Sequence, residues 1–155
     1  MREIRDKIMV LTTSYEKQLQ LYEEIRVVGA QERELIEQGC LDQLLLVLQK
    51  KEAILQEAGA EEVRIRSTQE LLVRHFQLDS FSIPRLKQVA SSRYYQDLVS
   101  LEEVVGRLVP VLEALEEQEK GNEALLSQYL EQVKEHSMDH LQVQRASRAY
   151  RGKRQ

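Results

Sequence analysis

The stretch LVPVLEALEEQEKGNEALLSQYLEQV, residues 108–133, carries a seam of mostly apolar residues at alternating steps of three and four. The same spacing extends from Leu101 to Val143. Steps that average 3.5 residues keep one stripe of a helix facing a partner helix. The stretch therefore predicts a long helix that packs lengthwise, and the rest of the chain predicts two similar but shorter helices. A seam longer than its internal partners indicates a surface for another protein.

The seam divides into two parts of different character. Over residues 98–115 it is regular and aliphatic, which predicts the core of a helical bundle. Glu119 and Asn122 then occupy seam positions, where polar residues either fix the register of the helices or lie at an exposed end. Beyond them the seam is broader and is interrupted by His136 and His140. We expect the rest of the chain to cover this second part only intermittently.

The composition favours long helices over a thick globular core. The chain has 155 residues, of which 42% are hydrophobic and 31% charged, with no Trp and 2 Pro. This length suits one domain. The single Cys excludes an intramolecular disulfide and fits a reducing compartment. The longest apolar run near the N-terminus, Ile8 to Leu11, is too short for a signal peptide or a membrane span, so we expect a cytoplasmic protein without membrane insertion.

Glycine, serine and proline mark the ends of the expected helices. Gly39 ends the first helix, because glycine is favoured just past a helix end, and the short join makes the first two helices antiparallel neighbours. Ser82 followed by Pro84 is a good helix start. The expected fold is all-α, an elongated antiparallel helical bundle or coiled coil of three long helices plus one short linker helix. Its single domain spans residues 1–147, with helices over about 3–38, 41–76, 83–90 and 93–147.

The apolar residues of the first two helices predict which faces are buried. The first helix has a stripe at Ile4, Ile8, Leu11, Tyr15, Leu19, Tyr22, Ile25 and Gly29. The second helix has its expected inner face at Leu41, Leu44, Leu45, Leu48 and Leu55. Lys50, Lys51 and Glu52 are expected to face solvent or to reach toward it. We expect the second helix to continue to Phe76, with a bend at Gly59 and a full break there as the main alternative.

Proline and charge set the expectations for the C-terminal third. Pro110 lies inside the third long helix, so we expect a kink near residues 106–110. Five basic residues and no acid follow Gln144, namely Arg145, Arg148, Arg151, Lys153 and Arg154. The remainder of the chain is acidic and would repel phosphate, so nucleic acid is not expected as a partner. Residues 148–155 have little to bury, and we expect a basic, flexible tail.

Residues that could carry catalytic or metal chemistry lack the surroundings that such chemistry needs. His136 and His140 share a helix face at a spacing that can hold a metal, but no Glu directly follows either His and no Cys is nearby. His75, a candidate for phosphotransfer, stands in an ordinary helix-end context. Cys40 has no accompanying catalytic groups in sequence. We therefore expect no enzyme activity, no metal site and no cofactor.

The candidate binding site is a broad apolar band after Asn122. We expect five residues of this band to contact a partner: Leu125, Leu126, Tyr129, Leu130 and Val133. The band is too broad for packing between two helices alone, and such a surface can accept an amphipathic helix from another protein. Self-dimerisation and folding back onto the first two helices are the rival explanations.

Four stretches, residues 22–39, 44–55, 78–90 and 108–133, form a pattern that is spread along most of the chain. The first runs from Tyr22-Glu-Glu-Ile to Glu34-Leu-Ile-Glu-Gln-Gly39, and the second contains Lys50-Lys51-Glu52-Ala53-Ile54-Leu55. The third reads LDSFSIPRLKQVA, and in the fourth Asn122 precedes a Leu pair. Together they resemble the FlgN-type flagellar export chaperones. Ala149-Tyr150-Arg151-Gly152 resembles the terminal Tyr-Gly element of that family, although Arg151 separates the two residues and Cys40 stands where the family tends to have an acid.

The resemblance implies a cytoplasmic type III flagellar secretion chaperone that needs no nucleotide or metal. Such chaperones bind the C-terminal helical segments of the hook-filament junction proteins FlgK and FlgL and keep them monomeric. They deliver these clients to the export gate through the cytoplasmic domain of FlhA, and the resemblance assigns the gate contact to Tyr150. The alternative is a structural coiled-coil protein without an export role, which self-associates into a homodimer through the same apolar band.

Overall fold

The fold is all-α, as predicted. The computed structural model describes the backbone of residues 2–153 and the side chains of residues 3–135. Its helices are α1 (Arg2–Gln38), α2 (Leu41–Phe76), α3 (Ile83–Val89) and α4 (Tyr95–Lys153), with a 3-10 turn, η1 (Ser92–Tyr94), before α4. No strand occurs within this described part of the chain. None of the helices, over the residues described, is both long and apolar enough to cross a membrane.

The helix ends lie close to the expected positions because the local signals act as predicted. Gly39 takes a positive φ of 70° at the turn between α1 and α2, a conformation that glycine adopts without steric cost. The Ser82 hydroxyl accepts a hydrogen bond from the backbone N–H of Arg85 and caps α3. Ser91 accepts from the N–H of Arg93 and caps η1, which is why α4 begins at Tyr95 rather than near residue 93.

The long helices are continuous through their weak points. α2 runs unbroken through Gly59, so the single-helix prediction is confirmed. α4 likewise continues as one helix through Pro110. It reaches Lys153, so its backbone includes most of residues 148–155, the segment expected as a tail. The flexibility of that segment stays a prediction.

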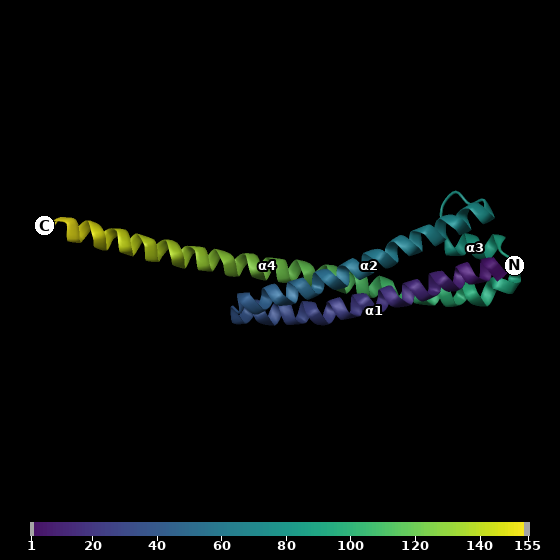
Figure 1. The fold of residues 1–155 in the computed structure, drawn as a ribbon, viewed down its shortest axis with the longest axis horizontal. Helices are drawn as coiled ribbons and strands as arrows, with labels where there is room; N and C mark the ends of the chain where they lie inside the picture. Colours follow the sequence, from purple (N-terminus) through teal and green to yellow (C-terminus); the bar gives the residue numbers. More distant parts are fainter. Residues whose placement is uncertain (1, 154–155) are drawn as a thin grey trace.

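Both other long helices pack against helix α1. It contacts both α2 and α4 along much of its length, whereas α2 and α4 make few backbone contacts with each other. Ion pairs indicate the relative directions of the helices. Lys17 lies 3.4 Å from Glu61, which fits antiparallel α1 and α2, and Arg5 lies 3.2 Å from Asp97 at the starts of α1 and α4, which are parallel. α4 then continues well past the α1–α2 turn (Figure 1).

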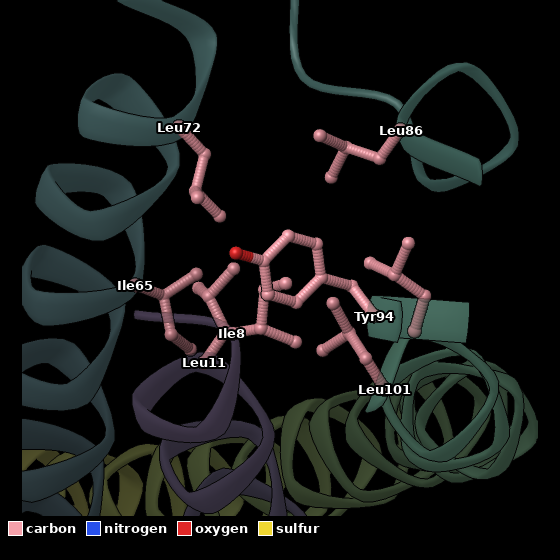
Figure 2. Close-up of a cluster of buried hydrophobic side chains, with 8 residues drawn as sticks. Ile8, Leu11, Ile65, Leu72, Leu86, Tyr94 and Leu101 are labelled. Carbon is pink, nitrogen blue, oxygen red and sulfur yellow. The ribbon is translucent and has the colours of Figure 1, made fainter. Parts of the chain in front are cut away.

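The apolar core is divided into clusters along this length. The cluster at the α3 end gathers side chains from α1, α2, α3, η1 and α4, as Figure 2 shows. Its buried members are Ile8, Leu11, Ile65, Leu72, Leu86, Tyr94, Leu98 and Leu101. A second cluster toward the turn contains Leu21, Ile25, Val28, Ile54 and Ala58. The predicted short helix thus closes one end of the bundle, because Leu86 of α3 is fully buried there.

The inner face predicted for α2 is wrong. Of its five predicted leucines only Leu44 is buried, while Leu45 is 60% exposed and Leu55 is also exposed. The buried row of α2 is Leu44, Lys51, Ile54, Ala58, Glu61, Ile65, Thr68 and Leu72. Two charged residues, Lys51 and Glu61, lie in this row because α1 offers each a partner of opposite charge, whereas Leu45 and Leu55 lie outside it.

Candidate functional site

The candidate site begins where α4 leaves the bundle. Tyr129 lies against the α1–α2 turn, since a Cβ added to Gly39 would lie 3.0 Å from the Tyr129 hydroxyl oxygen. This contact places Tyr129 at the far end of the two shorter helices. The part of α4 beyond it extends past the turn (Figure 1). Packing of α4 back onto α1 and α2 is one of the rival explanations of the apolar band. For Tyr129 this explanation holds, because its side chain contacts the turn between them.

A buried polar layer fixes the axial position of α4 just before this exit. The Asn122 side-chain amide donates a hydrogen bond of 2.8 Å to the backbone carbonyl of Gly29. Gln118, one turn earlier, donates to the carbonyl of Arg26 at 3.0 Å. Asn122 is buried, so the seam is covered at this position rather than open. Of the two roles considered for polar seam residues, the observed bonds favour register setting.

Lys51 joins three helices in the same layer. Its ammonium nitrogen lies 3.1 Å from Glu32 Oε1 of α1 and donates a hydrogen bond to Glu119 Oε2 of α4. Burial alone would lower the pKa of Lys51, but the hydrogen bonds and charges of Glu119 and Glu32 outweigh it, so the pKa is raised above its ordinary value. The expectation that Lys51 faces or reaches solvent is wrong, because its side chain is buried and pairs with the buried carboxylate of Glu32.

The five predicted contact residues separate into two groups. Leu125, Leu126 and Tyr129 are half-buried, whereas Leu130 is 49% and Val133 is 42% exposed. Leu126 and Val133 follow Glu119 by one and two heptads, so they share the edge of α4 that meets α2 through Lys51. Leu125 follows Gln118 by a heptad and lies on the other side of the seam. The exposed apolar surface is therefore carried by Leu130 and Val133, with Leu126 at its base.

The remaining candidate residues add no chemistry to this region. Tyr150 lies on the helical backbone of α4, but its side chain, like those of His136 and His140, is outside the described residues. His75 packs edge-on against Phe76 with ring centroids 4.8 Å apart. Cys40 is half-buried as a free thiol beside the turn. Among the side chains that the structure describes, no group of three or more His, Cys, Asp or Glu is placed to hold a metal.

A cavity of about 320 Å³ lies where the three long helices meet in mid-bundle. Its lining residues are Tyr15, Gln18, Tyr22, Glu62, Ile65, Arg66, Gln69 and Leu112. The Tyr15 hydroxyl accepts a 2.8 Å hydrogen bond from Gln69, and burial, only partly offset by this bond, raises the pKa of Tyr15. Burial and the charge of Glu62 raise the pKa of Tyr22. The polar groups of the lining are the two tyrosines, the amides of Gln18 and Gln69, and the exposed ion pair of Arg66 with Glu62 at 3.0 Å.

The sequence patterning missed two features of the site. The first is the buried layer around Lys51, whose only sequence signal is Glu119 and Asn122 on the apolar repeat. The second is the exposed leucines of α2 beside the turn, which the pattern assigns to the core. Both concern the same feature of α2, whose buried row contains Lys51 and Ile54 and leaves Leu45 outside it.

Comparison with known proteins gives one result across the whole length of the chain. Searches of curated proteins and of solved structures found no match. The FlgN protein family matches residues 1–155. That match agrees with the resemblance carried by the four stretches and with the helical fold. The chain therefore belongs to the FlgN family, a family of flagellar export chaperones.

Proposed function

We propose that this protein is a cytoplasmic type III flagellar secretion chaperone for hook-filament junction proteins of the FlgK and FlgL type. It binds their C-terminal helical segments, keeps them monomeric and delivers them to the export gate. One observation carries the proposal. α4 continues beyond the α1–α2 turn, and the side chains Leu130 and Val133 at this exit are exposed although they continue the apolar seam.

The physical argument concerns what an isolated client segment needs. A helical segment separated from its assembly partners exposes an apolar stripe, which makes it prone to aggregate. A helix face with apolar residues at steps of three and four covers such a stripe reversibly. The first part of the α4 seam is occupied by the bundle's own core, at Leu101 and Leu108 for example. The second part supplies the client surface, with Leu125, Leu126, Tyr129, Leu130 and Val133 as its residues.

The test is calorimetric titration of the full chain with the C-terminal segment of a FlgK-type protein. We expect binding in the micromolar range or tighter, and a weakening of about tenfold or more in a Leu130→Glu, Val133→Glu variant, because a charge replaces each buried apolar contact. Val109→Glu is the matched control. Val109 precedes Leu130 by three heptads and is similarly exposed, at 51%. Absence of binding at high micromolar concentration would refute the proposal, and equal weakening by the control would refute the site.

The export-gate contact is proposed for Tyr150, near the end of α4. The expected partner is the cytoplasmic domain of FlhA, and a Tyr150→Ala variant should lose affinity for it while still binding client. Tyr95→Ala, an exposed tyrosine at the opposite end of α4, should change neither interaction. Unaltered binding of Tyr150→Ala to the FlhA domain would remove this residue from the proposal without affecting client recognition.

The alternative is a structural coiled-coil protein that self-associates through the same exposed residues. Leu130 and Val133 favour it equally, since they would also bury against a second copy. Light scattering separates the two functions. A chaperone mixed with client should give the mass of a chaperone–client complex, even if the chaperone alone self-associates. A structural coiled-coil protein should give the mass of its dimer, unchanged when client is added.

A further inference from the structure

Three leucines at the start of α2 form an edge that lies outside the buried row of this helix. Leu41, Leu45 and Leu48 are spaced by four and three, so they are neighbours on one side of the helix. Leu45 is 60% exposed and the other two are half-buried. None of them belongs to the buried row of α2. We call these three residues the α2 leucine edge.

This edge lies beside the proposed client surface of α4. Leu48 is one turn before Lys51, whose ammonium nitrogen bonds Glu119, and Leu126 is one heptad after Glu119. Tyr129 contacts the turn at Gly39 immediately before α2. These two contacts bracket the α2 leucine edge and place it alongside α4 between Glu119 and Tyr129.

The mid-bundle cavity shows independently that the two stripes face the same side. Glu62 and Gln69 of α2 and Leu112 of α4 line it together. Glu62 and Gln69 follow Leu48 by two and three heptads, and Leu112 precedes Leu126 by two. Positions a whole number of heptads apart share one side of a packed helix. The α2 leucine edge and Leu126 therefore border the same α2–α4 boundary at the turn end of the bundle.

The rim of this boundary is acidic. Glu116 and Glu123 precede Leu130 by two heptads and one heptad, so they continue its edge of α4. Glu52 follows Leu45 by a heptad on α2. All three glutamates are exposed, and Glu116 also pairs with Lys120 of α4 at 3.4 Å. The uncompensated charge comes from Glu52 and Glu123. An occupant of this surface therefore needs an apolar stripe with basic residues beside it.

We propose that the α2 leucine edge and residues Leu126, Leu130 and Val133 of α4 form one surface, which binds a single amphipathic helix with basic flanks. The inference rests on the proposed chaperone function and extends its client site from one helix to two. α2 and α4 make few backbone contacts with each other, so a helix laid along both of them, opposite α1, completes a four-helix arrangement. The bound helix then buries its stripe against two apolar edges instead of one.

The experiment compares two adjacent leucines of α2 in the full chain. Leu45→Glu changes the α2 leucine edge, and Leu46→Glu changes a residue of similar exposure, 66%, that lies outside the edge. Both are exposed, so equal helix content by circular dichroism is expected. With the FlgK-type C-terminal segment as probe, Leu45→Glu should weaken binding by about tenfold and Leu46→Glu by less than about twofold. Equal effects of the two variants would overturn the inference and leave the chaperone proposal intact.

A second pair of probes separates the inference from the function on which it rests. Two synthetic helical peptides carry the same leucine stripe, flanked by lysines in one and by glutamates in the other. The lysine peptide should bind more tightly than the glutamate peptide, and Leu45→Glu should weaken it. If the lysine peptide behaves in this way but the FlgK-type segment does not bind, the chaperone proposal is refuted and the proposed two-helix binding surface is supported. Failure of the lysine peptide to exceed the glutamate peptide overturns the proposed occupant, and binding of neither peptide nor the FlgK-type segment overturns both proposals.

Discussion

At the residue scale, Lys51 connects α1, α2 and α4 through two carboxylates. Glu32 is buried with it, whereas Glu119 is exposed. A buried ion pair is expensive to desolvate, but removing one partner costs more than the pair itself because the other charge stays buried and unpaired. Lys51 therefore has its main effect as the partner of Glu32, at the point that sets the register of α4.

Replacement of Lys51 by Met should destabilise the fold by about 3 kcal/mol, because the Glu32 carboxylate loses its counter-charge. The measurement is urea unfolding followed by circular dichroism. Lys50→Met is the matched control, since its side chain is exposed, and a change within about 0.5 kcal/mol is expected. A Lys51→Met variant as stable as Lys50→Met would show that the buried pair does not hold the helices together.

The raised pKa of Lys51 predicts a loss of stability in alkali. The folded chain holds this proton more tightly than the unfolded chain, whose lysine has the ordinary pKa of 10.5. The contribution is complete below that pH and is lost as the pH rises through the higher folded-state pKa. The raised pKa values of Tyr15 and Tyr22 act in the same direction above their ordinary 10.0. The free energy of unfolding, measured from pH 8 to 12, should decline. The difference in this free energy between wild type and Lys51→Met should become smaller over the same range. A constant difference would contradict the raised pKa of Lys51.

At the element scale, two glycines of this chain have opposite roles. Gly39 has a positive φ and lies against Tyr129, so Gly39→Ala should destabilise the fold by about 1–2 kcal/mol. Gly59 lies inside α2, where an added Cβ meets no other atom within 4 Å. Gly59→Ala should therefore stabilise by about 0.5–1 kcal/mol. Thermal unfolding of both variants tests these two expectations. A change of the melting temperature in the same direction for both would contradict the turn geometry.

The helices themselves could be predicted from sequence, because local signals determine them. Gly39 and the Ser82–Pro84 cap mark ends that depend on a few neighbouring residues. The buried face of α2 could not be predicted from its leucines alone, because its buried row includes Lys51 and Glu61, whose partners Glu32 and Lys17 belong to α1. The residues of the α2 leucine edge likewise read as core in sequence. For the candidate site, the pattern predicts an apolar band on α4, and its role in binding stays a prediction. The division between half-buried Tyr129 and exposed Leu130 depends on where the turn at Gly39 lies.

At the scale of the whole molecule, the determining feature is the unequal length of the helices. α1 ends and α2 begins at the turn, while α4 continues past it to Lys153 (Figure 1). The end of the bundle with α3 is closed by a fully buried core that includes Leu72, Leu86 and Leu98. The other end carries the polar layer and then the exposed apolar residues. The proposed chaperone thus has one end for stability and one for client binding.

This polarity is tested most directly by amide hydrogen exchange of the full chain, with and without the C-terminal segment of a FlgK-type client. Backbone amides that open locally exchange faster, and a bound partner slows them. We predict slower exchange on client binding in α4 over residues 126–135, and unchanged exchange over α3 and its neighbours in the core. Protection confined to the α3 end, or no change in α4 at a client concentration that saturates binding, would contradict the account.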